Sequence, residues 1–299
     1  MPDLTDAEIQ AIISRVKGRV AAADIGGRAG QAIVAADAVA DVDDALGEGV
    51  FRTVDDAVGA AKRAFGAYQA LGLDARKRII EAIRASMRAE NERLAYMARQ
   101  ETGLGRADDK ILKNQLVIER TPGPEDLEPR VVTGDQGMMV AEYAPYGVIG
   151  AITPTTNPTS TIINNAIAIL SAGNSVTFNV HPSAKHVSVE NVKLLNRAVL
   201  SAGGPPDLVT CVAVPTLESA QALMQHPDVR VLLVTGGPGV VKEALRTPKK
   251  AITAGPGNPP AVVDQTADIA KAARDIVSGA SFDNNIICVD EKTTIAIDT

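Results

Sequence analysis

Two cysteines are the side chains of this sequence best suited to nucleophilic chemistry, and their surroundings differ. Cys211 lies in the apolar stretch 208–214, which favours an inert core thiol. Cys288 follows three consecutive polar residues, 283–285, in a segment that we expect to be a loop. A nucleophilic thiol needs partial exposure and surroundings that stabilise its thiolate, whereas cysteine in general is among the most buried residue types. Spacing alone leaves both interpretations of Cys288 open.

A second candidate is Asn157, in the segment TPTTNP at 153–158. Pro158 suits the first position of a helix, so Asn157 is expected at the N-cap. There its side chain could accept a hydrogen bond from a backbone N–H group of the helix, which is a common structural role. Alternatively, its amide could donate to an oxyanion that develops in a crevice. The segment itself leaves both roles open.

A glycine-rich turn within VLLVTGGPGVV at 231–241 is the third candidate. Gly236, Gly237 and Gly239 would let a phosphate approach the backbone closely, and the following helix would offer free N–H groups. The dinucleotide fingerprint G-x-G-x-x-G is incomplete, because Lys242 stands at its third glycine position. A tight strand-to-helix turn without a ligand is the alternative.

Short apolar runs alternate with amphipathic segments from Tyr146 onward, and this alternation positions the three candidates. We expect strands at 148–153, 175–179, 208–214 and 229–234, and helices at 159–170, 187–202, 217–225 and 240–246. Continuously apolar strands between such helices are typical of a parallel sheet covered on both faces. The prediction is an α/β fold with a doubly wound, Rossmann-like parallel sheet, whose ligands bind at the carboxyl ends of the strands.

The flanking regions carry their own signals. A helix capped by Thr53 and a second at about 74–102, stopped by Gly103, are expected before the sheet. Alternating segments at 130–133 and 138–143 predict a hairpin arm within 124–146. After 260–263 we expect a helix at 267–278, the loop with Cys288, and a strand at 293–297.

The first twenty residues form a separate unit. Thr5 and Glu8 make a capping box, and apolar residues then recur at helical spacing: Ile9, Ile12, Ile13, Val16 and Val20. Residues 21–50 are rich in Ala, Gly, Asp and Val and are typical of a flexible linker. An amphipathic helix on a linker suits a docking peptide, and a helix packed on its own domain is the alternative.

Composition excludes several classes of protein. The 299 residues carry a net charge of −6 with 3% aromatic residues and no Trp, which argues against nucleic acid as a partner. No apolar run approaches the ~20 residues of a membrane span, and charged residues interrupt any signal peptide. The three histidines have no metal-ligand spacing, so no metal site is expected. We expect a soluble, cytoplasmic protein.

Five segments, in this order, resemble the aldehyde dehydrogenase superfamily: TPTTNP at 153–158, FNVHPSAK at 178–185, LLVTGGPG at 232–239, ITAGPGNPPAVV at 252–263 and SFDNNIICVDEK at 281–292. The match is strongest to its CoA-acylating branch, the acetaldehyde and propionaldehyde dehydrogenases of bacterial microcompartments and the aldehyde half of bifunctional alcohol/aldehyde dehydrogenases. The resemblance implies a nucleotide-binding domain at 51–264 and the start of a second α/β catalytic domain at 265–299. Members of the superfamily continue well beyond this length.

The resemblance also implies roles for single residues. Cys288 would be the nucleophile, and Asn157 with the backbone N–H of Cys288 would form the oxyanion hole. NAD is implied as the cofactor, with NADP left open, and coenzyme A as the co-substrate. The residues expected to contact the cofactor are Thr153, Pro154, Thr155, His181, Pro182, Ser183, Thr235, Gly236, Gly237, Gly239, Val240 and Gly255.

Two departures from hydrolytic relatives refine the expectation. Their Glu-Leu-Gly-Gly stretch, whose Glu activates water, is replaced here by AGPGN at 254–258, which favours attack by the CoA thiol on the thioester. His181-Pro-Ser-Ala184 stands where they often have Lys-Pro-Ser-Glu, and the loss of that Lys and Glu leaves the choice of cofactor open. We expect oxidation of a short-chain aldehyde to acyl-CoA, with propanal as the favoured substrate. A hydrolytic aldehyde dehydrogenase and a non-catalytic nucleotide-binding or shell-docking fragment are the alternatives.

The resemblance finally bears on partners. Residues 1–20 resemble the encapsulation peptides of microcompartment enzymes, which implies docking on shell or core proteins and a location inside a microcompartment. A homo-oligomer is expected for the full-length form.

Overall fold

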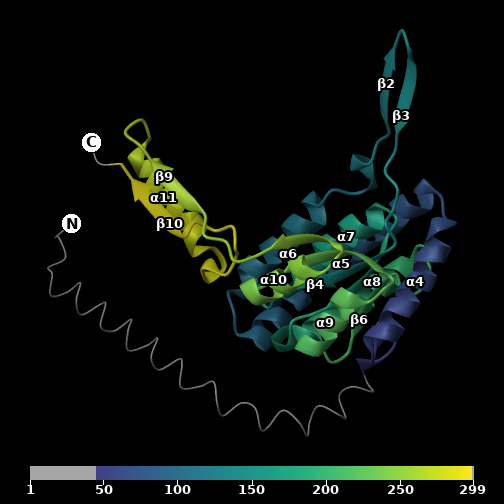
Figure 1. The fold of residues 1–299 in the computed structure, drawn as a ribbon. Helices are drawn as coiled ribbons and strands as arrows, with labels where there is room; N and C mark the ends of the chain where they lie inside the picture. Colours follow the sequence, from purple (N-terminus) through teal and green to yellow (C-terminus); the bar gives the residue numbers. More distant parts are fainter. Residues whose placement is uncertain (1–44, 298–299) are drawn as a thin grey trace, which may run out of the picture. The chain divides into compact units, whose positions relative to one another are not determined.

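A parallel sheet of six strands forms the centre of the computed structural model, which describes residues 45–297 (Figure 1). The strand order is β1-β6-β5-β4-β7-β8, and every neighbouring pair is parallel. The strands are β1 (Val50–Phe51), β4 (Val148–Ile152), β5 (Ser175–Asn179), β6 (Val209–Val212), β7 (Val229–Thr235) and β8 (Lys250–Ala254). The predicted doubly wound α/β class is confirmed.

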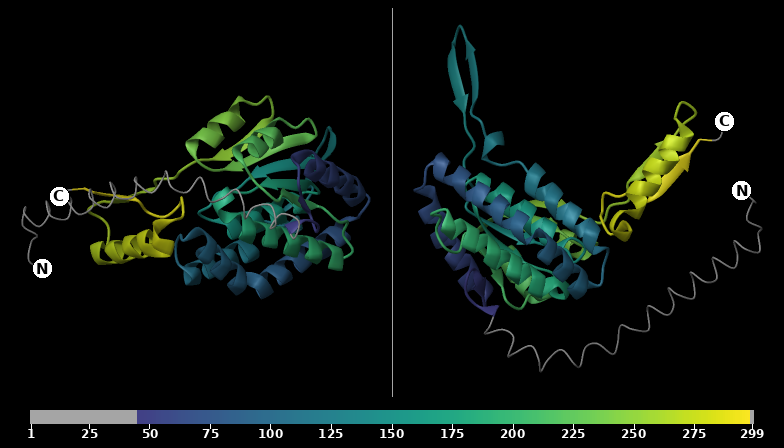
Figure 2. Two further views of the ribbon diagram at one scale, coloured as in Figure 1. Left: turned by 90° about the horizontal axis from the view of Figure 1, so that it is seen from below. Right: turned by 180° about the vertical axis from the view of Figure 1, so that it is seen from behind.

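Helices cover both faces of this sheet, as the left view of Figure 2 shows. On one face α4 (Val54–Gln69), α9 (Leu217–Gln225) and α10 (Pro238–Arg246) share a core with β4 and β7. On the other face α7 (Pro158–Ser171) and α8 (Lys185–Ser201) pack on the strands, with α5 (Leu73–Thr102) and α6 (Ala107–Arg120) against them. Because both faces are covered, all five residues of β4 are buried, which explains its continuously apolar sequence.

The helix boundaries follow local signals in the sequence. Thr53 caps α4, since its Oγ1 accepts a hydrogen bond from the backbone N–H of Asp56 at 3.1 Å. Helix α5 ends at Gly103, whose left-handed φ of 69° suits glycine. Both features confirm the predictions for this region.

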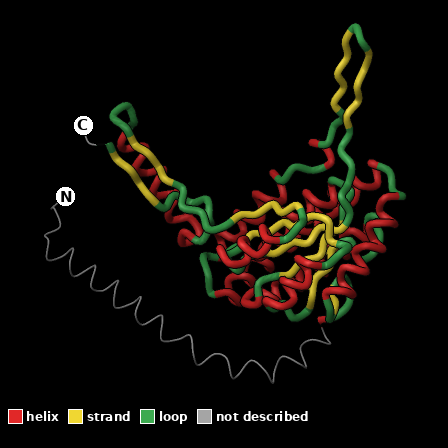
Figure 3. Tube along the Cα trace, in the orientation of Figure 1, coloured by secondary structure: helices red, strands yellow, loops and turns green. Residues whose placement is uncertain are grey.

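A hairpin and a small βαβ unit complete the described chain (Figure 3). Strands β2 (Arg130–Gly134) and β3 (Gly137–Ala141) pair in antiparallel fashion within the predicted arm, and all their residues are exposed. Strands β9 (Pro260–Val263) and β10 (Thr293–Ala296) are parallel neighbours, and α11 (Ile269–Ser281) lies between them in the sequence. This βαβ unit agrees with the predicted second α/β element, while a domain boundary at 264/265 stays a prediction.

The predictions also differ from the structure in places. Helix α6 and strands β1 and β8 were not expected. The predicted helix at 1–20 and most of the predicted linker at 21–50 lie outside the described residues. The end of that linker is folded, because Gly47 and Val50 exchange two backbone hydrogen bonds of 3.0 Å and Val50 is buried in β1. Within the described range, no helix has the length and apolar character to cross a membrane.

Candidate active site

The strand order reverses between β4 and β7. From β4 the chain proceeds to β5 and β6 on one side, and then crosses to β7 and β8 on the other. A parallel sheet binds ligands at such a switch point, outside the carboxyl ends of its strands. The segment 153–157 follows β4 and the segment 236–239 follows β7, so the fold brings the predicted catalytic amide and the glycine-rich turn to neighbouring strand ends.

The glycine-rich turn leads directly into α10. Gly237 is the N-cap of this helix and Pro238 its first residue. The N–H of Gly236 donates to the carbonyl of Ala254 at 3.1 Å, which fixes the turn on β8. A Cβ atom at Gly237 or Gly239 would meet no other atom within 4 Å. Open backbone at a helix N-terminus fits a phosphate group.

The other predicted cofactor residues lie at the same edge of the sheet. Thr153 follows β4 and is buried, and its Oγ1 has no hydrogen-bond partner in the described part of the chain. His181 follows β5, where its Nδ1 accepts from the N–H of Ser183 at 3.1 Å, and burial lowers its pKa and so favours the neutral imidazole. The rest are half-buried or exposed: Pro154, Thr155, Pro182, Thr235, Val240 and Gly255.

Asn157 does not cap α7 through its side chain. It occupies the N-cap position, but its side chain makes no capping hydrogen bond. Instead, Oδ1 accepts from Nζ of Lys113 at 2.6 Å, and Nδ2 donates to Oγ1 of Thr156 at 3.1 Å. The capping interpretation of this residue is therefore wrong in the structure, because a side chain from α6 has taken the acceptor oxygen.

The two cysteines differ in exposure as their sequences suggest. Cys211 is fully buried in β6, and burial raises the pKa of its thiol to about 12. Cys288 is half-buried, in the loop between η4 (Phe282–Asn285) and β10. A thiol held inside the sheet is inert at neutral pH, so Cys288 is the one with the exposure that a nucleophile requires.

The loop before Cys288 has an unusual backbone. Asp283, Asn284 and Asn285 have φ values of 44°, 56° and 60°, all in the left-handed region that non-glycine residues rarely adopt. Asn and Asp tolerate this conformation better than other side chains. Strained backbone of this kind persists where the surrounding contacts over-determine it.

The carboxylate of Asp283 supplies the first set of those contacts. It is fully buried, accepts from the backbone N–H of Arg106 at 2.6 Å and from Nζ of Lys110 at 3.1 Å, and pairs with Lys113. A Cβ atom at residue 105 would overlap this carboxylate, which explains Gly105. The first turn of α6 is thus the support on which the loop rests.

Asn285 and Lys292 close the loop from inside. Nδ2 of Asn285 donates to the carbonyls of Ala280 at 2.8 Å and Glu291 at 3.0 Å. Nζ of Lys292 donates to Oδ1 of Asn285 at 2.5 Å and to the carbonyl of Ile287 at 2.9 Å. Two of the three polar residues at 283–285, Asp283 and Asn285, therefore anchor the loop, a role that is not apparent from the sequence.

Gly257 packs against the backbone of Cys288. A Cβ atom at this glycine would overlap the carbonyl oxygen of Cys288. The segment 254–258, which departs from the hydrolytic relatives in having no carboxylate, thus reaches the residue expected to be the nucleophile.

Two further ionisable groups near the loop are shifted by burial. Burial lowers the pKa of Lys113, an effect that its contact with Asp283 opposes. Burial raises the pKa of Asp290, whose Oδ2 finds no hydrogen-bond partner among residues 45–297. Within the same range, no group of three or more His, Cys, Asp and Glu side chains is arranged to hold a metal ion.

Comparisons with known proteins support this fold. Residues 35–296 match the model of the aldehyde dehydrogenase family. The acetylating acetaldehyde dehydrogenase EutE of Salmonella typhimurium is 51% identical over 252 residues, which are 84% of this chain and 54% of that protein. The chain therefore spans about half the length of the curated relatives it matches.

Solved structures give the same relationship. The propionaldehyde dehydrogenase of Rhodopseudomonas palustris, with bound CoA and an acylated cysteine, superposes with a TM-score of 0.82 at 50% identity, covering 84% of this chain and 58% of that one. A propionaldehyde dehydrogenase from the fucose utilisation microcompartment of Clostridium phytofermentans gives a TM-score of 0.82 at 49% identity, with the same shares covered.

Proposed function

The chain belongs to the aldehyde dehydrogenase family, and from that membership we propose that it oxidises a short-chain aldehyde, propanal first, to the corresponding acyl-CoA. NAD would take the hydride, with NADP as the alternative, and coenzyme A would take the acyl group. A half-buried Cys288, in a loop anchored at both ends, is the nucleophile that this proposal requires.

One observation carries the choice of CoA over water. Gly257 packs on Cys288, and no residue of the segment 254–258 has a carboxylate. Water attacks a thioester slowly unless a general base removes its proton, whereas a thiol is intrinsically far more nucleophilic. The segment that approaches the nucleophile therefore favours acyl transfer to a thiol.

The first chemical step uses Cys288 and Asn157. The Cys288 thiolate adds to the aldehyde carbonyl and forms a thiohemiacetal. Its oxyanion would accept hydrogen bonds from Nδ2 of Asn157 and from the backbone N–H of Cys288. Loss of one such donor typically reduces the rate by about 10²- to 10³-fold.

The cofactor would bind at the carboxyl ends of β4 and β7. The N-terminus of α10, with Gly237 and Gly239 open to an approaching group, fits the pyrophosphate, and segments 153–155 and 181–183 flank it. Bound there, NAD would supply the acceptor for the hydride that leaves the thiohemiacetal carbon. Cys288 would be left acylated as a thioester, and the CoA thiolate would attack it to release acyl-CoA and the Cys288 thiolate.

NADH formation from propanal in the presence and absence of CoA tests the proposal. We expect sustained NADH formation only with CoA, no more than one equivalent per chain without it, and none from Cys288→Ser. Repeated turnover without CoA would favour a hydrolytic enzyme. Cofactor binding without turnover would favour the non-catalytic alternative. Because the chain covers 54% of its relative, the assay should include a version extended to the relative's length.

A second assay isolates the nucleophile from the cofactors. p-Nitrophenyl propionate acylates a reactive thiol and releases p-nitrophenolate, and it needs neither NAD nor CoA. We expect the chain to release a burst of p-nitrophenolate and Cys288→Ser to release none. Addition of CoA should then remove the acyl group from Cys288. Failure of the chain to acylate while Cys288 remains reactive toward iodoacetamide would contradict the proposed site.

We further propose that residues 1–20 dock the protein on shell or core proteins of a bacterial microcompartment in the cytoplasm. The apolar stripe from Ile9 to Val20 supports this, as does the microcompartment named for the Clostridium phytofermentans relative. A fluorescent protein fused to residues 1–20 should form foci in cells that express the shell. Diffuse fluorescence there would contradict docking.

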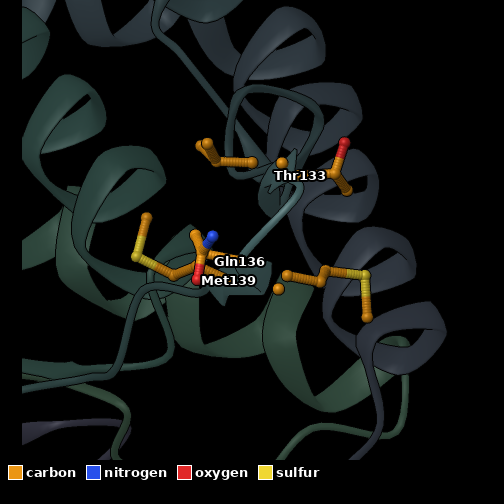
Figure 4. A pocket seen from close by; sticks show the side chains of 7 residues that line it. Thr133, Gln136 and Met139 are labelled. Atoms are coloured by element: carbon orange, nitrogen blue, oxygen red, sulfur yellow. The ribbon is translucent and has the colours of Figure 1, made fainter.

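A homo-oligomer is the remaining proposal about partners. Strands β2 and β3 expose apolar side chains around a shallow pocket that includes Thr133, Gln136 and Met139 (Figure 4). An exposed apolar patch of this kind marks an interaction surface, and a second copy of the chain is the proposed occupant. Light scattering after size-exclusion chromatography should give a molecular mass that is a multiple of the chain mass. Met139→Glu should shift that molecular mass toward the mass of a single chain.

A further inference from the structure

Lys113 lies between the two parts of the proposed active site. Its ammonium group donates to Oδ1 of Asn157 at 2.6 Å and pairs with the carboxylate of Asp283. Asn157 follows β4, and Asp283 belongs to the loop that leads to Cys288. One side chain from α6 therefore contacts both the segment that carries the amide and the loop that carries the thiol.

The contact with Asn157 fixes which end of its amide is directed away from α6. A carboxamide has an acceptor oxygen and a donor nitrogen, whereas an ammonium group is a donor only. Lys113 can therefore hold Oδ1 and not Nδ2. Of the two N–H groups on Nδ2, one donates to Oγ1 of Thr156 at 3.1 Å, and the other would donate to the oxyanion.

Burial makes this contact a strong one. Lys113 is 7% exposed, so water competes little for its protons. A hydrogen bond from a charged donor is about twice as strong as a neutral one. It also polarises the amide, so that the Nδ2 protons become better donors. The same burial requires the countercharge that Asp283 supplies.

We infer that Lys113 is a positioning residue for the proposed acylation, and that it holds the Asn157 amide as a donor to the oxyanion formed at Cys288. This inference rests on the proposed function, because it requires Cys288 to attack a carbonyl group. Lys113 acts through Asn157 and not on the reacting atoms.

Lys110 provides a matched control. It lies on the same face of α6, is buried to a similar degree, and also donates to Asp283, at 3.1 Å. Its other contact is the carbonyl of Thr156 at 3.4 Å, and the bond to the Asn157 side chain belongs to Lys113. Lys110→Met thus removes a buried charge and an Asp283 contact while leaving the amide held.

Two reactions of Cys288 separate positioning from structural damage. Acylation by p-nitrophenyl propionate passes through an oxyanion, whereas alkylation by iodoacetamide does not. Lys113→Met should slow acylation by about 10-fold or more, with the loss in Asn157→Ala, about 10²- to 10³-fold, as the upper bound. Alkylation should stay within about twofold of the wild type, and Lys110→Met should lower acylation less than Lys113→Met does.

A double-mutant cycle completes the test. In the Asn157→Ala background, Lys113→Met should cost little more, because the group it positions is absent. Three results would each overturn the inference. Lys113→Met could acylate as fast as the wild type, it could lose acylation and alkylation in parallel, or the losses in the cycle could be additive. Absence of a burst from the wild type would instead refute the proposed function.

A second set of variants separates positioning from misfolding. If circular dichroism shows that Lys113→Met is unfolded, Lys110→Met and Asp283→Asn are added, which removes all three buried charges. The same ratio of acylation to alkylation then decides: a lower ratio than in the Lys110→Met/Asp283→Asn variant supports positioning, and an equal ratio refutes it.

Discussion

Gly257 and Cys288 are in direct contact, and a Cβ atom at Gly257 would overlap the carbonyl oxygen of Cys288. The loop that carries Cys288 therefore rests on the segment between β8 and β9. This contact joins the strand edge of the large sheet to the proposed nucleophile.

The first prediction concerns that contact. Gly257→Ala forces the Cys288 backbone to move, together with the N–H group proposed to bind the oxyanion. A displacement of about 1 Å in an active site can cost about 10²-fold in rate, and we expect a loss of that order in acylation by p-nitrophenyl propionate. Gly66→Ala, at an open position on α4, is the control and should acylate normally. Normal acylation by Gly257→Ala would show that the Cys288 backbone can shift without consequence.

The second prediction concerns thiol selectivity. Burial raises the pKa of Cys211 to about 12, so its thiolate is scarce at pH 8 and the side chain is also inaccessible. Iodoacetamide at pH 8 should label the folded chain at Cys288 alone, and both cysteines in urea, as peptide mass spectrometry would report. Labelling of Cys211 before unfolding would contradict the packing of β6.

The third prediction separates catalysis from binding at Asn157. The Asn157 side chain makes no capping bond but accepts from the buried Lys113 ammonium, so Asn157→Ala should lower the unfolding free energy by about 1.5–3 kcal/mol. In a version of the protein that turns over, kcat should fall by about 10²- to 10³-fold, with a much smaller change in the KM for aldehyde. A change confined to KM would assign Asn157 to binding and not to the oxyanion.

The fourth prediction concerns Tyr68, whose hydroxyl donates to the carbonyl of Leu170 at 3.1 Å. Burial raises its pKa to about 12, whereas an unfolded tyrosine ionises near pH 10. The unfolded state therefore loses this proton first, and stability falls as pH rises from about 10 to 12. Tyr68→Phe should cost about 1 kcal/mol at pH 7 and weaken that pH dependence, as urea titrations would measure.

A surface tyrosine gives the matched control. Tyr96 on α5 is 51% exposed, so Tyr96→Phe should leave both the unfolding free energy at pH 7 and its decline at high pH close to wild type. Equal pH dependence in Tyr68→Phe and the wild type would show that the Tyr68 hydroxyl does not contribute.

The strands at the centre of the sheet could be predicted because burial on both faces leaves a continuous apolar run. β4 and β5 are buried along their whole length, and their expected bounds agree with the structure within a residue. β8 is an edge strand with alternating exposure from Lys250 to Ala254, so it gives no such run. The two residues of β1 are too few to form a pattern.

Helix α6 could not be predicted from apolar spacing because its pattern is reversed. Lys110 and Lys113 face the interior, whereas Leu112 and Leu116 are 52% and 61% exposed. A prediction from the apolar stripe would therefore place the leucine face toward the core and the lysine face toward solvent, opposite to the structure. The charge that justifies this reversal, Asp283, is remote in sequence, so local reasoning could mark Cys288 and Asn157 as candidates but not the side chain that links their segments.

The dependence of Lys110 and Lys113 on Asp283 has a consequence for biosynthesis. As the chain leaves the ribosome, the strands of the large sheet and α6 emerge well before residue 283. Until that carboxylate arrives, Lys110 and Lys113 lack its countercharge. A buried charge without a countercharge typically destabilises a protein by about 3–5 kcal/mol. The nascent domain thus reaches its full stability in the same event that folds the loop carrying Cys288.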